Sequence, residues 1–264
     1  MMSYPANRFV IGQEVALWVK DNFKKTLVGL QSYKSKCYKE ALEECFLKLD
    51  ELMATPAGQR KLQEYQSTSD GDYGGKSFAG CTATVILVTR TEIICANAGD
   101  SRTVLSSGGR AKDMSEDHKP ENPGELSRIQ RSGGFVEDGR VNGMLALSRA
   151  LGDFEYKNNS SIDVKLQAVT AFPDVSIEPI NAQTQYVLLA CDGIWDVKTS
   201  QEAIDFMNTK LYKGNFASGR REMRELEASM TQLLDECCAR DIASSQGLGC
   251  DNMTAIIVEI NQNK

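Results

Sequence analysis

The amino-acid sequence predicts an α+β fold, with helices at the start, a central block of strands, and late helices before a final strand. Apolar residues recur at helical spacing over residues 15–30 and again over residues 42–53. From residue 81 onward the pattern changes to short β-branched runs separated by polar turns. No internal repeat or low-complexity segment is evident.

The two opening helices lead into a polar stretch. Residues 55–79 are rich in glycine and polar side chains, and this composition predicts a long loop. Strands are predicted at 81–88 and 91–98, and a strand from residue 102 leads through a Ser-Ser-Gly-Gly turn into another short strand. We expect these strands to form an antiparallel meander.

The second half of the chain has clear helix boundaries. A helix begins at Pro123 and ends at a Gly-Gly pair, because proline suits the first helical turn and glycine the left-handed C-terminal position. Thr199 and Glu202 have the spacing of a capping box, which predicts that another helix begins there. Apolar residues at 223–237 indicate a longer helix, and residues 253–260 a final strand.

Composition sets wide limits on function. With 264 residues, 41% of them apolar, the chain can bury a core as one large domain or two small ones, and no apolar run can span a bilayer. A formal charge of −6 argues against nucleic acid as a partner. The eight cysteines include no Cys-x-x-Cys pair, and no signal peptide precedes them. We expect a soluble protein of a reducing compartment, cytoplasmic or nuclear, without a membrane partner.

The single histidine, His118, excludes several mechanisms. A Ser-His-Asp hydrolase would have to use this residue, which lies in a polar turn, and the sequence contains no nucleophile elbow. A histidine-rich zinc site is excluded for the same reason. We interpret His118 as a side chain that closes a loop before a helix.

Aspartates stand at the ends of apolar runs in three places. Asp192 and Asp196 follow the run at 186–191, Asp100 follows the run at 91–98, and Asp251 precedes the final strand. Each one alone is typical of a turn in which the aspartate caps its own backbone. Together they indicate one acidic metal site, because carboxylates beside apolar strands are costly without a cation or donors, and hard divalent cations bind carboxylate oxygens.

Short motifs follow one another along the chain. They are Gly80-Cys81-Thr82-Ala83, Ala98-Gly99-Asp100-Ser101-Arg102, Asp117-His118-Lys119-Pro120, Arg140-Val141-Asn142-Gly143, Leu147-Ser148-Arg149-Ala150-Leu151-Gly152-Asp153, Cys191-Asp192-Gly193-Ile194-Trp195-Asp196 and Asp251-Asn252-Met253-Thr254. In this order, over residues from about 12 to 260, they resemble the motifs of the metal-dependent serine/threonine protein phosphatases of the protein phosphatase 2C type.

The resemblance implies a fold and a reaction. The fold is a four-layer α/β/β/α sandwich, in which two central antiparallel sheets are flanked by helix pairs, formed here by residues 1–264 as a single domain. Manganese or magnesium is held at one end of the sandwich. Two such cations lower the pKa of a bridging water, which attacks the phosphoserine or phosphothreonine ester in line, so no covalent intermediate is needed.

The resemblance also implies roles for particular residues. Asp192 and Asp251 match ligands of the first catalytic metal, whereas Asp100, Asp192 and Asp196 match a weaker third-metal site. Arg140 matches a position that contacts substrate. No residue of this chain matches the family's catalytic acid, so no catalytic side chain is identified.

The start of the chain departs from the family pattern. Members carry an R-x-x-M-E-D segment and then D-G-H-G-G before the first helix, and neither motif occurs here. If the helix keeps its register, Arg8 falls on the metal-bridging aspartate and Val10 on the histidine, within a divergent head at residues 1–11. We therefore expect impaired catalysis, missing N-terminal strands and an uncovered sheet edge.

Three functions follow from these observations as hypotheses. The first is a phosphoprotein phosphatase of the family in a shortened, impaired form. The second is a non-catalytic pseudophosphatase that binds phosphoproteins or regulates a partner. The third is an interaction module that uses the exposed edge. The sequence indicates neither the physiological substrates nor the oligomeric state.

Overall fold

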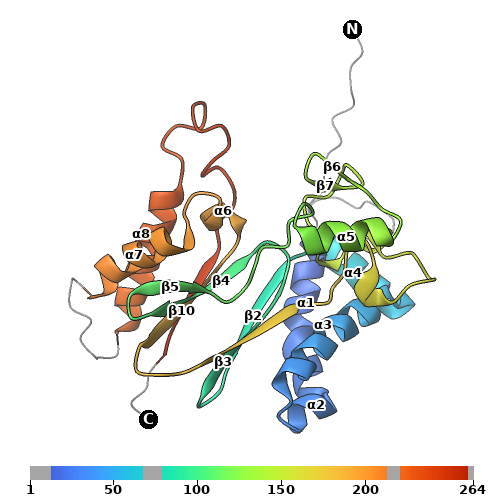
Figure 1. Cartoon of the computed structure of the whole chain (residues 1–264), viewed down its shortest axis with the longest axis horizontal. Helices are drawn as coiled ribbons and strands as arrows, with labels where there is room; N and C mark the ends of the chain where they lie inside the picture. The colour runs from blue at the N-terminus through green and yellow to red at the C-terminus, as the bar shows by residue number, and fades with distance from the viewer. Residues whose placement is uncertain (1–12, 68–78, 213–220, 261–264) are drawn as a thin grey trace. The chain divides into compact units, whose positions relative to one another are not determined.

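The structure is a computed structural model that describes residues 13–67, 79–212 and 221–260 (Figure 1). The chain divides into two compact units. Unit 1 contains Met1–Thr82 and Lys119–Pro173, and unit 2 contains Ala83–His118 and Asp174–Lys264. Within the described ranges, no helix has both the length and the apolar character that a membrane crossing requires.

Unit 1 opens with helices that pack on one another through apolar faces. They are α1 (Glu14–Gly29), α2 (Gln31–Lys34), α3 (Tyr38–Ala54) and α4 (Pro56–Ser67). In α3 the fully buried residues include Leu42, Phe46 and Leu49, which recur at the helical spacing that the sequence predicts. The ring of Phe46 meets that of Phe23 from α1 edge-on, with the centroids 5.6 Å apart.

The predicted loop at 55–79 is wrong over residues 56–67, which form α4. Thr55 starts this helix, since its hydroxyl accepts a hydrogen bond from the Gly58 N–H at 3.0 Å, and Pro56 follows it in the first turn. Leu62 is fully buried, so the helix is held by tertiary packing in spite of its polar composition. Residues 68–78 lie outside the described ranges.

The rest of unit 1 is made of short elements. β1 (Gly80–Cys81) pairs antiparallel with β8 (Leu151–Gly152), and β6 (Val136–Glu137) pairs with β7 (Arg140–Val141). Helix α5 (Pro123–Arg131) begins at the predicted proline and is followed by Gly133 with φ +93°, which confirms the predicted start and stop signals. The 3₁₀ turns η1 (Phe154–Tyr156) and η2 (Val164–Leu166) are the remaining elements among the described residues of the unit.

The described residues of unit 2 form two antiparallel sheets. The first has the order β2-β3-β9, and the second has the order β11-β10-β4-β5. Their strands are β2 (Ala83–Val88), β3 (Glu92–Ala98), β4 (Arg102–Ser107), β5 (Arg110–Asp113), β9 (Asp174–Pro179), β10 (Thr184–Ala190) and β11 (Ala255–Glu259). The predicted meander is therefore wrong between β3 and β4, because the turn at Gly99, with φ +119°, carries the chain from one sheet to the other.

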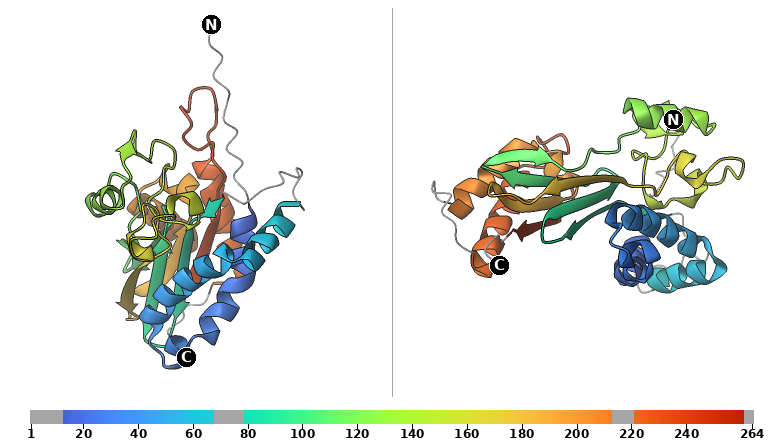
Figure 2. Two further views of the ribbon diagram at one scale, coloured as in Figure 1. Left: turned by 90° about the vertical axis from the view of Figure 1, so that its right-hand side faces the viewer. Right: turned by 60° about the horizontal axis from the view of Figure 1, so that its bottom comes forward.

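Residues of β10 alternate between two hydrophobic layers. Val187 and Leu189 pack with Ile93 and Leu105 between the sheets, whereas Tyr186 and Leu188 face the helices. Figures 1 and 2 show α7 and α8 together on the outer face of the sheet that contains β4 and β10. The helices of this layer are α6 (Asp192–Trp195), α7 (Ser200–Tyr212) and α8 (Met223–Cys237).

These elements confirm the α+β class with two antiparallel sheets. Unit 2 supplies both sheets and one helix layer, while α1, α3 and α4 belong to unit 1. The predicted capping box of α7 is present, since Glu202 accepts hydrogen bonds from the N–H and hydroxyl of Thr199, both at 2.8 Å. The head at residues 1–11 lies outside the described ranges.

Candidate metal centre

The three aspartate-bearing turns leave the same end of one sheet. Ala190, the last residue of β10, pairs with Arg102 on one side and with Ala255 on the other. Asp100 lies just before Arg102, Asp192 just after Ala190, and Asp251 shortly before Ala255. Strand pairing therefore brings together carboxylates that are far apart in the sequence.

Asp192 lies at the centre of this arrangement. It is half-buried at the start of α6, and its Oδ1 accepts a hydrogen bond from the Gly193 N–H at 2.9 Å. Burial raises the pKa of Asp192, and the neighbouring charges of Asp100, Asp251 and Asp196 raise it further. Asp192 is thus repelled by three neighbouring carboxylates, as expected of a site that a cation would neutralise.

Gly193 explains why an aspartate-glycine pair occurs here. A Cβ at this position would lie only 2.5 Å from the backbone oxygen of Asn252, so no larger residue fits without displacing the backbone. Cys191 contributes to the same contact, since its backbone N–H donates to the Thr254 oxygen at 3.1 Å. The turn that carries Asp192 is thereby packed against the turn that carries Asp251.

The remaining carboxylates differ in exposure. Asp100 is only 6% exposed, whereas Asp196 and Asp251 are exposed to solvent. The Oδ1 of Asp251 accepts a hydrogen bond from the Asn252 N–H at 2.6 Å. This aspartate therefore caps its own turn, which is the role that the sequence predicts for each aspartate taken alone. Turn capping and metal binding are compatible, because a capping carboxylate retains oxygen lone pairs for other partners.

Arg102 connects three of the sequence motifs. Its Nε and Nη2 donate to the two carboxylate oxygens of Asp117, both at 2.8 Å, and its Nη1 donates to the Ser200 hydroxyl at 3.1 Å. The guanidinium also lies over the Trp195 ring, 5.2 Å from its centroid. Sequence reasoning gave Arg102 and Asp117 no role, although both stand inside the quoted motifs.

His118 closes the turn that carries Asp100. The imidazole is 3% exposed, and its Nδ1 lies 3.1 Å from the Gly99 nitrogen and 3.0 Å from the Gly99 oxygen. Its Nε2 lies 3.2 Å from the carboxylate of Asp174 on β9. The interpretation of His118 as a loop-closing residue is confirmed, and its partner Asp174 could be found only from the structure.

The donor chemistry of this cluster fits a hard divalent cation, because all four side chains offer carboxylate oxygens. Within the described ranges, however, no three His, Cys, Asp or Glu side chains lie close enough together to hold a metal ion. The aspartates are electrostatic neighbours and not a preformed cage.

Arg140, the predicted substrate contact, belongs to unit 1. It stands on the exposed hairpin formed by β6 and β7, whose turn has positive φ at Asp138 and Gly139. Its Nη1 donates to the Met144 oxygen at 2.7 Å, which holds the side chain along the hairpin. The four aspartates belong to unit 2, and the role of Arg140 stays a prediction.

A second polar cluster of unit 1 explains the Leu147–Asp153 motif. Glu125 of α5 is buried and accepts from Arg128 at 2.6 Å, from Arg149 at 2.7 Å and from the Ser148 hydroxyl at 2.5 Å. Burial alone would raise the pKa of Glu125, but hydrogen bonds from Arg149 and Ser148 and the two guanidinium charges lower it to about 2. The motif therefore anchors the segment after β7 to α5.

The glycine and aspartate that end the same motif pack against β1. Gly152 has φ +80°, and a Cβ there would lie 2.5 Å from the Ala79 backbone oxygen. A Cβ on Gly80 would lie 1.9 Å from the carboxylate of Asp153, which is 7% exposed. Both positions require glycine because a side chain at either one would collide with the neighbouring segment. This contact explains why the Gly80–Ala83 and Leu147–Asp153 motifs occur together.

Comparison with known proteins decides the family. The sequence model of the family described as Protein phosphatase 2C matches residues 9–245. The chain belongs to the protein phosphatase 2C family. Members are metal-dependent protein serine/threonine phosphatases, so the recognition made from the motifs is confirmed at the level of the family.

Two curated relatives and one solved structure illustrate the match. Protein phosphatase 2C 1 of Paramecium tetraurelia is 43% identical over 253 residues, which cover 95% of this chain and 80% of the relative. Protein phosphatase 2C homolog 3 of Schizosaccharomyces pombe is 43% identical over 251 residues, covering 95% of this chain and 54% of the relative. The crystal structure of serine-threonine phosphatase 2C from Toxoplasma gondii has a TM-score of 0.67 at 20% identity, covering 95% of this chain and 82% of that one, and it supports the fold alone.

Proposed function

We propose that this chain binds one manganese or magnesium ion at the Asp192–Asp251 end of the sheet and hydrolyses phosphoserine and phosphothreonine in proteins with strongly impaired turnover. The observation that carries the proposal is the meeting of three carboxylate-bearing turns at one rung of β4, β10 and β11, in a chain of the protein phosphatase 2C family. Phosphoproteins are the substrates that the family implies.

Each part of the chain has a distinct task in this proposal. Asp192 and Asp251 would hold the ion, and Asp100 and Asp196 would add negative charge beside it. When bound, the ion supplies Lewis-acid polarisation of the phosphoryl group and a bound water of lowered pKa. Arg102 and His118 keep the acidic turns in place, and Arg140 would contact the phosphoprotein.

Impairment follows from the residues at the head of the chain. If the helix that begins at Glu14 keeps the family register, Arg8 falls on the position of the metal-bridging aspartate, and a guanidinium there would add repulsion to the loss of a ligand. A pair of tightly bound metals is therefore not expected.

The test measures manganese-dependent turnover of an aryl phosphate and of a phosphopeptide. We expect low turnover that is abolished in Asp192→Ala and unchanged in Asp235→Ala, a matched change at an exposed aspartate of α8. A chimera that carries the R-x-x-M-E-D and D-G-H-G-G segments ahead of Glu14 should recover turnover by roughly 100-fold or more. High turnover in the unmodified chain would contradict impairment, and an inactive chimera with bound metal would contradict the assignment of the site.

A second candidate is a non-catalytic phosphoprotein-binding module. The arginine at position 8, where the family has its metal-bridging aspartate, favours this candidate as well. It predicts that the chain binds phosphopeptides with measurable affinity while releasing no phosphate, even at saturating manganese. Isothermal titration with a phosphopeptide, next to a phosphate-release assay on the same sample, separates the two functions. Release of phosphate by the chain, lost in Asp192→Ala, would exclude the second candidate.

A further inference from the structure

β11 is an edge strand of its sheet in the part of the chain that the structure describes. The Ile260 N–H donates to the Gln185 oxygen at 2.9 Å, and the Cys191 N–H donates to the Thr254 oxygen at 3.1 Å. Because hydrogen-bonded positions alternate along an antiparallel ladder, the even-numbered residues of β11 bond to β10. The backbone N–H and C=O groups on the opposite side of the strand belong to Ala255, Ile257 and Glu259.

Both faces of the strand are apolar at this edge. Ile257 packs on the side of α8, and Val258 packs on the side of the other sheet. Ile256 remains 56% exposed although it lies in the middle of the strand. Among the described strands, none pairs with this side of β11. An edge strand with apolar side chains on two faces is the usual template for pairing with a further strand.

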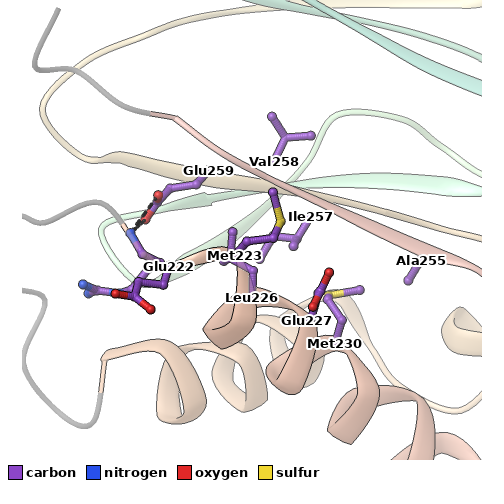
Figure 3. Close-up of a pocket in the computed structure, with 10 residues that line it drawn as sticks. Glu222, Met223, Leu226, Glu227, Met230, Ala255, Ile257, Val258 and Glu259 are labelled. Atoms are coloured by element: carbon purple, nitrogen blue, oxygen red, sulfur yellow. Dashed lines mark hydrogen bonds between the residues drawn. The ribbon is translucent and has the colours of Figure 1, made fainter.

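A groove runs beside this edge. It has a volume of about 910 Å³ and lies between β11 and the first half of α8, whose Met223, Leu226 and Met230 form its apolar wall. Figure 3 shows Ala255 and Ile257 on the same side of the strand as this wall, with Val258 on the opposite side. Met223 is 69% exposed, so much apolar surface is available to a partner.

The charges around the groove favour one kind of occupant. Its lining includes the carboxylates of Glu222, Glu227 and Glu259 and one guanidinium, that of Arg221. Arg221 is directed toward the ring of Tyr212, with its guanidinium carbon 4.7 Å from the centroid. A second copy of the chain would bring the same excess of negative charge to the interface, whereas a basic segment would be attracted.

We propose that β11 and the groove beside α8 form a docking edge for an extended segment of another protein. The segment adds a strand to the sheet through the backbone of Ala255, Ile257 and Glu259. Its side chains are apolar on both faces, toward Met223 and Met230 on one side and Ile256 on the other. It carries a lysine or arginine next to the apolar run, which reaches Glu227.

The experiment uses the full chain and a fluorescein-labelled peptide with five alternating Val and Ile residues between two lysines. Fluorescence anisotropy should show saturable binding. The same peptide with proline at its centre should not bind, since proline cannot supply the ladder hydrogen bonds. Equal binding of both peptides would overturn strand addition.

A charge exchange identifies the groove. Glu227 is exposed, and Glu227→Lys should weaken binding of the lysine peptide by roughly fivefold or more, while binding recovers with a peptide that carries glutamates instead. Glu236→Lys, a matched change on the same helix outside the groove, should leave binding unchanged. Equal effects of the two variants would place the peptide elsewhere.

Amide exchange gives a readout that a loose hydrophobic contact would not produce. On peptide binding, the amides of Ala255, Ile257 and Glu259 should become protected, while those of Ile256 and Val258, already bonded to β10, should change little. Odd-numbered amides that are protected before the peptide is added would overturn the proposal. Sedimentation of the peptide-free chain as a dimer that Ile257→Lys abolishes would also overturn it, because a second copy would then occupy the edge.

Discussion

The buried carboxylate of Glu125 gives the sharpest test of how unit 1 is held together. It is 6% exposed and is the shared partner of Arg128 and Arg149, whose side chains are 10% and 12% exposed. In Glu125→Gln the shape is kept, but two buried guanidinium groups lose their counter-charge. Breaking a buried ion pair from one side typically costs about 3 to 5 kcal/mol.

The pKa of Glu125 gives a second value for the stability that this carboxylate contributes. It falls from an ordinary value of 4.5 to about 2 in the fold. At about 1.4 kcal/mol for each pKa unit, the carboxylate contributes roughly 3 kcal/mol to the free energy of unfolding at neutral pH. Because the folded pKa is depressed, this contribution is present above the ordinary pKa and is lost as the pH falls from 4.5 toward 2.

The assay is native-state amide exchange in dilute urea, which reports each unit separately. We expect the α5 amides of Glu125→Gln to open more easily by about 3 kcal/mol at pH 7, with a smaller difference from wild type near pH 3. The β10 amides of unit 2 serve as an internal control, and Glu137→Gln, at an exposed site of unit 1, as a control variant. A decrease of less than about 1 kcal/mol in the free energy of opening of the α5 amides, or a decrease that does not depend on pH, would refute the reasoning.

Three further predictions concern other carboxylates and one glycine. Burial raises the pKa of Asp153 from 3.8 to about 6, with the charges of Glu155 and Asp50 adding to the rise and that of Lys157 opposing it. The ionised carboxylate therefore lowers the free energy of unfolding by roughly 3 kcal/mol at pH 7. In urea unfolding, Asp153→Asn should stabilise the chain at pH 7 but not near pH 4, and destabilisation at pH 7 would contradict this prediction. Calorimetry should detect at most one weak manganese or magnesium site, abolished by Asp192→Ala, and two tight sites would show that the centre has been misread. Gly193→Ala should weaken manganese binding by roughly tenfold or more because its Cβ would lie 2.5 Å from the Asn252 oxygen, and unchanged affinity would separate the glycine from the site.

The sequence by itself determined the class of the fold and the positions of most helices. Periodicity located α1, α3 and α8, and capping chemistry located the starts of α5 and α7, because these signals act over a few residues of the chain. The same local reasoning failed at α4. Its polar composition resembles a loop, and the contacts that bury Leu62 come from other helices.

The motifs also determined the family and the four candidate ligands, since strand-ending aspartates have local chemical reasons that the sequence displays. Only the tertiary structure decided how they meet. The pairing of Ala190 with Arg102 and Ala255 unites turns that are far apart in the sequence, and strand register cannot be read from any one segment.

The sequence pattern likewise did not predict which strands belong to which of the two sheets. β3 and β4 are consecutive and similar in composition, so their pattern predicts one meander, yet Gly99 separates them into two sheets. Which strand neighbours which depends on contacts between distant segments, such as that of β10 with β4. The same long-range pairing leaves β11 at an edge and places Glu125 between two arginines, because burial and electrostatic partnership are properties of the folded chain and not of its local sequence.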